Sequence, residues 1–449
     1  MRIIKNYNQL ATSKARKNVL NIIEAGIKKV HPHNLIEIAI QYNETFNSVT
    51  VQNNTYDIIK GRIFVIGGGK ASGFMAEKLE EIIGAKNITV GVVNCTKDDY
   101  QTEKIKIIKA SHPLPDKKGV KGVEKMLELK NKYKINKKDL VICLISGGGS
   151  ALMPCPVEGI KLKDKQLTTQ LLLESGADIR EINIVRKHLS KAKGGQLAVH
   201  FAPAQVVSVI ISDVVENNMD VIASGATVAD PTTFRDAYAV LSKHGLLEKI
   251  PQSIRRYIEQ GVHGKAEETP KEVSNCNNYI IGDAATAMET MALEAKKIGL
   301  KPLIASCELV GETETVAIEK ARDIASGDYE SFDLVLFGGE TTPKLPANYG
   351  RGGRNQHYIA VSMFALRDMS RTWAMASIAT DGIDYLPGVA GAIIDDNSLS
   401  RSREIGQKTE DLIKNYATNN LFTQLGDSLI NTDETGTNVG DIVVYYLKK

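Results

Sequence analysis

Two glycine-rich segments contain the residues best suited to chemistry in this sequence. The first, Gly67-Gly68-Gly69-Lys70, directly follows an apolar run, and so does the second, residues 146–150. Glycines let backbone N–H groups approach an anion, and a helix that begins there adds partial positive charge. Lys70 brings a full positive charge to the same place. We therefore expect a phosphate-binding site made of Gly67, Gly68, Gly69, Ser146, Gly147, Gly148, Gly149 and Ser150.

Neither segment matches the common nucleotide motifs. Gly69-Lys70 is followed by Ala71 and has no glycine at the required distance before it, so it is not a Walker A loop. Ser72 stands where a GxGxxG motif has its third glycine, and the acidic residue expected at the end of the next strand is missing. The pattern disfavours nicotinamide binding. A tight strand-to-helix turn with a solvated lysine remains the structural alternative.

A third glycine-rich segment, residues 350–357, carries Arg354 at the start of a predicted helix. A guanidinium group can hold a carboxylate or a phosphate with two parallel hydrogen bonds. The alternative is a surface turn with a solvated arginine.

Four acidic residues lie near predicted strand ends: Asp213, Glu340, Asp381 and Asp384. In open α/β sheets, ligands bind outside the carboxyl ends of the strands, so these carboxylates could converge on one crevice. One or two carboxylates together with substrate phosphates are a typical environment for Mg²⁺. Each residue taken alone is more often a loop cap than a metal ligand.

The elements that must position these residues are short apolar strands alternating with segments of helical period. This alternation predicts a parallel sheet covered on both faces, followed by a second α/β region. A helix is expected near residues 12–30, and the polar stretch at 260–270 is the expected domain boundary. The predicted strands lie at 62–66, 88–93, 105–108, 140–145 and 206–211, and then at 279–282, 302–304, 334–337, 376–379 and 442–446.

Composition restricts the function further. The chain has 449 residues and a formal net charge of +3, which gives no electrostatic sign of nucleic-acid binding. Its five cysteines are widely spaced, and no run of apolar residues is long enough to cross a membrane. We expect a cytoplasmic protein with reduced thiols that acts on small molecules, as a monomer or homodimer.

Taken together, the sequence resembles the class II glycerate kinases, the glycerate 2-kinases with a MOFRL domain. The resemblance spans nearly the whole chain, and its stretches occur in the family's order. They are 67–71, 111–116, 146–152, 181–190 with 193–195, 211–214, 222–225, 338–341, 352–356 and 380–384.

The resemblance implies two three-layer α/β domains, residues 1–268 and 269–449, the first Rossmann-like with a mainly parallel sheet, and an active site in the cleft between them. It implies transfer of the γ-phosphoryl group of Mg-ATP to D-glycerate, giving 2-phosphoglycerate. Lys70 and Arg354 match the family's essential lysine and arginine. Asp213 is the candidate general base, Glu340 and Thr341 join the nucleotide site, and Asp213, Asp381 and Asp384 are candidate Mg²⁺ ligands, with Glu340 as an alternative.

The chain departs from the family pattern around the expected cleft, and these departures put the acceptor in question. They lie at Glu216, Asn217, Ala226, His357 and Gly388. Three alternatives stay open: a kinase of another hydroxy acid or sugar acid, a hydroxypyruvate reductase, which 2-hydroxy-acid chemistry makes plausible, and a non-catalytic nucleotide or metabolite sensor.

Overall fold

The computed structural model describes residues 2–405 and 408–448, and the chain forms two compact units. The N-terminal unit runs from Pro32 to Ile281. The C-terminal unit contains the chain from Gly282 onward together with the residues up to His31. This division differs from the expected boundary between residues 268 and 269 in two places: the start of the chain and the strand β9 (Cys276–Gly282).

The first 31 residues belong to the C-terminal unit, and their largest contact there is a helix pair. Helix α2 (Lys14–Lys29) begins at Ser13, whose side chain accepts a hydrogen bond from the Arg16 N–H, and it buries an apolar face. This face packs on α12 (Ala284–Lys297). The packing is so close that a Cβ on Gly26 would lie 2.6 Å from Met291 Cγ.

The N-terminal unit contains a six-stranded sheet in the order β6-β5-β4-β7-β8-β9. Strand β9 was expected in the second domain but completes this sheet. The other elements of the unit are α3 (Pro32–Ala39), β1 (Ile40–Asn43), β2 (Ser48–Val51), β3 (Asn54–Asp57), β4 (Ile63–Gly68), α4 (Ser72–Ile83), η1 (Ala85–Asn87), β5 (Ile88–Cys95), β6 (Ile105–Lys109), α5 (Lys117–Tyr133), β7 (Leu140–Ile145), α6 (Gly149–Leu152), α7 (Leu162–Glu174), α8 (Ile179–His188), α9 (Gln196–His200), β8 (Gln205–Ile211), η2 (Val215–Asn217), η3 (Ile222–Ser224), α10 (Phe234–Lys243) and α11 (Gln252–Val262).

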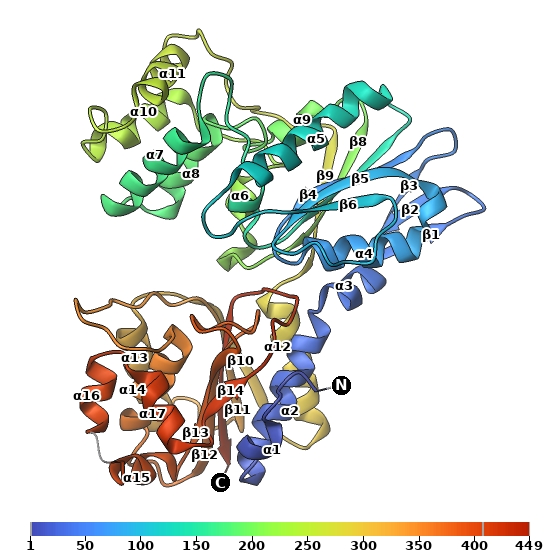
Figure 1. Ribbon diagram of the computed structural model, residues 1–449. Helices are drawn as coiled ribbons and strands as arrows, with labels where there is room; N and C mark the ends of the chain where they lie inside the picture. The colour runs from blue at the N-terminus through green and yellow to red at the C-terminus, as the bar shows by residue number, and fades with distance from the viewer. Residues whose placement is uncertain (1, 406–407, 449) are drawn as a thin grey trace. The chain divides into compact units, whose positions relative to one another are not determined.

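Strands β4 to β8 pair in parallel, as the sequence predicts. Every residue of β4 and β7 is buried, since helices cover both faces of the sheet: α4 lies on one face and α5 with α9 on the other (Figure 1). Beside the sheet, α7, α8, α10 and α11 form a helical subdomain with its own apolar core. The strands β1, β2 and β3 form a small antiparallel sheet.

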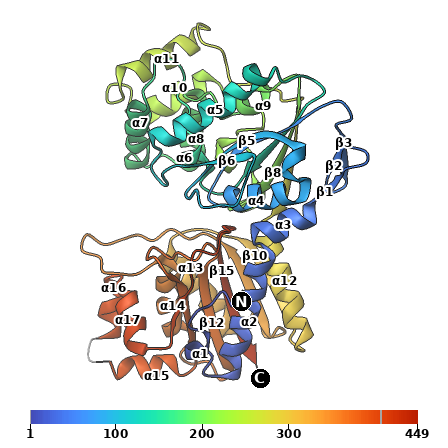
Figure 2. The ribbon, with the colours of Figure 1, turned by 45° about the vertical axis from the view of Figure 1, so that its right-hand side comes forward.

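The C-terminal unit is also a three-layer α/β structure, but its sheet is mixed. The strand order is β10-β11-β15-β12-β13-β14, in which β10 and β11 are parallel and the other pairs antiparallel. Helices α2 and α12 cover one face, and α13, α14 and α17 the other (Figure 2). The elements not yet bounded are α1 (Tyr7–Leu10), β10 (Pro302–Leu309), α13 (Thr313–Ser326), β11 (Leu334–Gly339), α14 (Arg354–Ala365), β12 (Thr372–Ala379), β13 (Val389–Asp395), α15 (Ser398–Arg403), α16 (Thr409–Lys414), α17 (Thr418–Leu425), β14 (Leu429–Asn431) and β15 (Asp441–Lys448).

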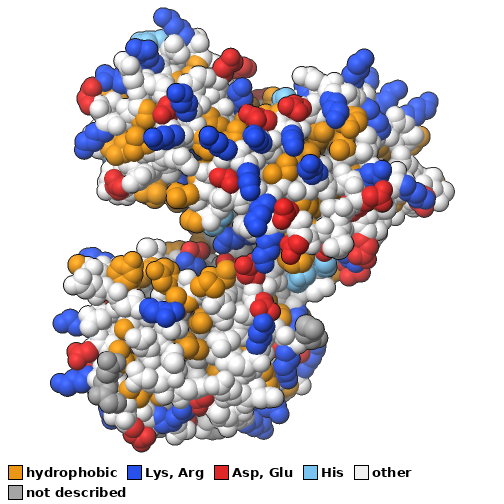
Figure 3. All heavy atoms as spheres, in the orientation of Figure 1, with side chains coloured by type: hydrophobic (Ala, Val, Ile, Leu, Met, Phe, Trp, Pro, Cys, Tyr) orange, Lys and Arg blue, Asp and Glu red, His pale blue; other side chains and the backbone are white. Residues whose placement is uncertain are grey.

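The molecular surface agrees with the small net charge. Lys and Arg side chains are interspersed with Asp and Glu over the face shown in Figure 3. Within the described residues all five cysteines carry free thiols. None of the helices in the described ranges has the length and apolar character needed to cross a bilayer.

Candidate active site

The two glycine-rich segments meet at the point where the N-terminal sheet reverses its strand order. From β4 the chain proceeds to β5 and β6 on one side, then crosses to β7 and β8 on the other. Ligands of open α/β sheets bind outside the carboxyl ends of the strands at such a point. Residues 67–70 leave the sheet from β4 and residues 146–150 leave it from β7, so both predicted segments lie there.

Two glycines of the first segment are required by the packing of the two segments on each other. Gly67 has a φ of +141°, and a Cβ there would lie 2.1 Å from the Leu144 carbonyl oxygen. A Cβ on Gly69 would lie 2.1 Å from the Ser146 hydroxyl oxygen. The packing alone therefore explains why both positions are glycine, and no bound ligand is needed to explain it.

The backbone N–H groups of the first segment also have protein acceptors. The Lys70 N–H donates to the Gly147 carbonyl at 2.8 Å, and the Ala71 N–H donates to the Ser146 hydroxyl at 3.0 Å. This backbone therefore holds the second segment in place. The expected phosphate cradle at Gly67, Gly68 and Gly69 contributes the Lys70 side chain rather than a row of open N–H groups.

The second segment is the more open of the two. Gly148 has a φ of +79°, and a Cβ there would lie 2.9 Å from His112 Cδ2 and 3.2 Å from Lys70 Cγ, so these side chains flank the loop. The N–H groups of Gly148 and Ser150 have no acceptor among the described residues. Open N–H groups beside a lysine form an anion-binding arrangement.

A pocket of about 790 Å³ extends from this loop toward α7 and α8. Gly148 and Ser150 are among its lining residues, together with Lys165 of α7, Arg186 of α8 and Lys193 of the loop after α8. Sequence analysis missed these three cations because they are spread over two helices and a loop. The signal that could have found two of them is the run 181–195, one of the stretches that resembles the glycerate kinases.

Burial perturbs all three of these cations. Desolvation lowers the pKa of Lys165 to about 7 and lowers the pKa values of Lys193 and Arg186. The positive charges of Lys165 and Arg186 lower the pKa of Lys193 further. An anion in the pocket would relieve both effects.

In the C-terminal unit, Arg354 is the first residue of α14 and is held by two carboxylates. Its Nε and Nη2 atoms donate to the two carboxylate oxygens of Asp441, the Nη2 contact being 3.0 Å. Its Nη1 donates to Glu340. Burial alone would lower the pKa of Arg354, but the charges of Asp441 and Glu340 raise it above its ordinary value.

Asp441 is a site residue that sequence analysis did not find. It begins β15, which runs antiparallel to β11 and β12, so the start of β15 lies beside their ends: Asp441 pairs with Gly339 and with Ala379. A search of strand ends alone overlooks such a residue. Burial raises the pKa of Asp441 to about 6, which leaves it ionised at neutral pH.

Asp384 caps a helix in this structure. Its carboxylate oxygens accept hydrogen bonds from the backbone N–H groups of Asn355 and Gln356 at 3.0 and 2.9 Å, at the start of α14. Burial raises the pKa of Asp384. Asp384 therefore does not fit the role of metal ligand. Thr341 is also turned inward: it is buried, and its hydroxyl accepts from the Thr313 hydroxyl at 3.1 Å.

The remaining metal candidates are distributed over both units. Asp213 follows β8 in the N-terminal unit, and Asp381 follows β12 in the C-terminal unit. In the described ranges no group of three or more His, Cys, Asp or Glu side chains could hold a metal ion. Mg²⁺ commonly takes only one or two carboxylates and completes its shell with phosphate and water, so Asp213 and Asp381 each fit as single ligands.

His357, one of the departures from the family pattern, has a structural place. It is fully buried in α14 and stacks on Tyr416, with ring centroids 3.7 Å apart. Burial lowers its pKa to about 4. The side chain is therefore part of the packing of α14, and it is neutral at physiological pH.

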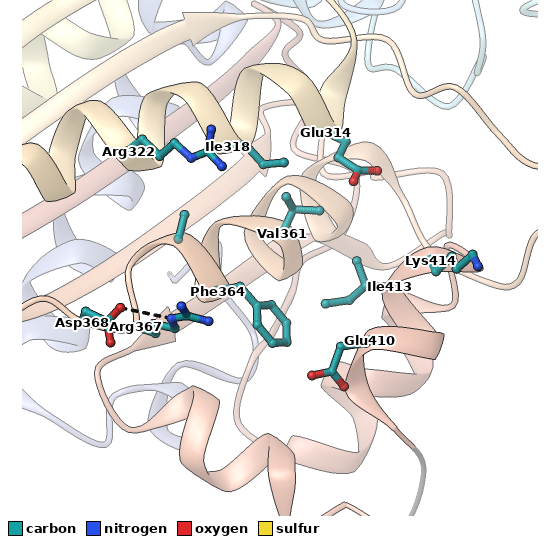
Figure 4. Close-up of a pocket in the computed structure, with 11 residues that line it drawn as sticks. Glu314, Ile318, Arg322, Val361, Phe364, Arg367, Asp368, Glu410, Ile413 and Lys414 are labelled. Carbon is teal, nitrogen blue, oxygen red and sulfur yellow. Dashed lines mark hydrogen bonds and ion pairs between the residues drawn. The ribbon is translucent and has the colours of Figure 1, made fainter.

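A second pocket, of about 560 Å³, lies in the C-terminal unit between α13, α14 and α16 (Figure 4). Its lining contains three acidic residues, Glu314, Asp368 and Glu410, and three basic ones, Arg322, Arg367 and Lys414. Arg367 donates to Asp368 at 3.1 Å, as the dashed line in Figure 4 marks. The α14 residues that line this pocket come from the second half of the helix, whereas Arg354 is its first residue. Arg354 does not line the pocket. The pocket has no net attraction for an anion.

Comparison with known proteins gives two family matches. Residues 18–259 match the domain of unknown function DUF4147, and residues 333–441 match the MOFRL family. A glycerate 2-kinase of Pyrococcus horikoshii is 39% identical over 95% of this chain and 96% of its own length. A protein of Agrobacterium vitis that carries the provisional name hydroxypyruvate reductase is 37% identical over 88% of this chain and 89% of its own. The crystal structure of a glycerate kinase from Thermotoga maritima superimposes with a TM-score of 0.82 at 32% identity, covering 96% of this chain and 99% of that one.

Proposed function

Since the chain belongs to the class II glycerate kinase family, we propose that it transfers the γ-phosphoryl group of ATP to the 2-hydroxyl group of D-glycerate, giving 2-phosphoglycerate. The observation that carries the proposal is the position of Lys70 beside an open glycine loop at the switch point of a parallel sheet. Phosphoryl transfer requires mainly positioning and neutralisation of charge, and this arrangement can supply both.

Each candidate residue then has a defined task. The N–H groups of Gly148 and Ser150 hold phosphate oxygens, and Lys70 neutralises charge on the transferred group. Arg354 binds the carboxylate of glycerate or the transferred group, and Asp213 accepts the proton of the acceptor hydroxyl. Asp213 and Asp381 would hold Mg²⁺, which when bound neutralises the phosphate charge.

The name of the Agrobacterium relative makes hydroxypyruvate reduction the second candidate. Two features weigh against it: the segment at 67–72 lacks the GxGxxG spacing, and the strand β5 ends at Asn94-Cys95 without the acidic residue that binds a nicotinamide ribose. These features favour phosphoryl transfer over hydride transfer.

The test is a phosphoryl-transfer assay with Mg-ATP and D-glycerate, in which phosphorus NMR identifies the product. NADH oxidation with hydroxypyruvate is followed in parallel. We expect 2-phosphoglycerate and no oxidation of NADH. Activity only on a longer hydroxy acid would move the proposal to another acceptor, NADH oxidation alone would replace it, and ATP binding without any transfer would indicate a sensor.

A further inference from the structure

The lining of the pocket beside the glycine loop has basic side chains and no acidic ones. Its described lining residues include Lys165, Arg186 and Lys193 but no Asp or Glu. Burial disfavours the charged forms of the two lysines, and an anion that enters the pocket favours them, because opposite charges attract strongly where the local dielectric constant is lower than that of water. The pocket is thus suited to an anion of more than one charge.

None of these three basic side chains is paired with a carboxylate in the described part of the chain. Lys193 Nζ donates to the Ser150 carbonyl at 2.9 Å, and Lys165 Nζ donates to the Leu189 carbonyl at 3.2 Å. Carbonyl oxygens orient the ammonium groups without neutralising them. Arg186 makes no hydrogen bond or ion pair within the described part of the chain. Its guanidinium group can therefore hold phosphate oxygens without losing a protein partner.

Part of the lining of the pocket is apolar. Leu114 and Leu173 line it with 72% and 59% of their surfaces exposed, and three prolines lie beside them. A volume of about 790 Å³ suits a ligand of drug size and is much larger than a three-carbon acid needs. The pocket therefore combines a polyanion site with an apolar slot.

We propose that this pocket binds the nucleoside triphosphate donor. The triphosphate lies against Lys165, Arg186 and Lys193 and the N–H groups of Gly148 and Ser150, and the base lies on Leu114 and Leu173. Gly148 is in contact range of Lys70, which places the phosphate end of the donor beside that lysine. The inference rests on the proposed kinase function, because it takes ATP as the donor.

The basic and apolar parts of the lining can be tested separately by calorimetric titration with ATP and with inorganic triphosphate. Arg186→Met removes one charge from a residue without hydrogen bonds, and we expect a tenfold to hundredfold loss of affinity, in order of magnitude, for both probes. Leu173→Ser changes an exposed apolar residue and should weaken ATP about threefold to tenfold while leaving triphosphate binding unchanged. Arg180→Met, on the exposed side of α8, is the matched control and should bind both probes as the wild type does.

Other outcomes overturn the inference. Unchanged affinity of both variants for both probes excludes the pocket as the donor site, and loss of D-glycerate binding alone in Arg186→Met assigns it to the acceptor. Thermal unfolding of each variant shows whether a loss of affinity reflects a loss of fold. The two proposals can also fail separately. If the wild-type protein forms no 2-phosphoglycerate but the Arg186→Met variant binds triphosphate more weakly than the wild type, the kinase proposal fails and the proposed nucleotide site stands.

Discussion

Arg354 and the basic residues of the N-terminal pocket differ in their hydrogen-bond partners: Arg354 is paired with carboxylates, and the pocket residues are not. All three nitrogens of the Arg354 guanidinium group have carboxylate partners, Asp441 and Glu340. Lys165, Arg186 and Lys193 contact only carbonyl oxygens or no protein acceptor in the described residues. An anion can enter the N-terminal pocket without displacing a protein group, whereas an anion that binds Arg354 must compete with a carboxylate. Glu340, whose side chain is 48% exposed, is the partner that can be displaced at least cost.

The largest expected effect comes from removing the charge on either side. Lys70→Met and Arg354→Met should each lower kcat about a hundredfold to a thousandfold, because each removes a cation that stabilises charge in the transition state. Steady-state kinetics of 2-phosphoglycerate formation measures the loss. Arg367→Met, in the exposed turn after α14, is the control and should turn over normally. Near-parental turnover of both variants in their folded state would contradict the assignment.

A smaller effect is expected on stability, and it tests whether the ion pairs of Arg354 with Asp441 and Glu340 stabilise the fold. Asp441→Asn should lower the free energy of unfolding by about 2 kcal/mol, since it leaves a largely buried guanidinium group without its two-point partner. Glu340→Gln should cost less than about 1 kcal/mol, because its carboxylate is half exposed. Urea denaturation at neutral pH measures both. Equal costs for the two variants would show that the two carboxylates hold Arg354 alike.

The smallest expected effect is the uptake of a fraction of a proton when triphosphate binds. Burial lowers the pKa of Lys165 to about 7, so above that pH the side chain is mostly neutral in the free protein. A bound polyanion favours the charged form, so we expect triphosphate binding at about pH 8.5 to take up a fraction of a proton, and affinity to fall as pH rises above 7. Calorimetry in buffers of different ionisation enthalpy measures the uptake. Lys165→Met should reduce the uptake and leave the part that belongs to Lys193, whose pKa burial also lowers. An unchanged uptake in that variant would assign the proton to another group.

The sequence predicts the N-terminal site better than the C-terminal one, for physical reasons. The glycine segments follow continuous apolar strands, and parallel strands place their carboxyl ends at one edge, so residues 67–70 and 146–150 lie together at that edge of the sheet as their pattern predicts. In the mixed sheet the start of an antiparallel strand shares that edge, which is why Asp441 was missed.

The local sequence pattern also does not reveal which side chains are buried or which distant segments pack together. Asp384 has the residue type of a metal ligand, but both of its carboxylate oxygens accept hydrogen bonds from N–H groups at the start of α14. The cations of the pocket come from α7, α8 and the following loop, and only the packing of these elements brings them together. The placement of the first 31 residues likewise depends on a partner helix more than 250 residues later in the chain.

The packing of α2 on α12 has a consequence for how the protein is made. Residues 32–281 form a contiguous unit that can fold as it leaves the ribosome, but α2 emerges before every strand it will cover. Its apolar face stays without its native partner until the last third of the chain has been synthesised. A fragment that begins at Gly282 would leave the matching face of α12 bare and prone to aggregation, whereas a circular permutant that starts at Gly282 and returns through residues 2–281 would supply α2 directly after β15.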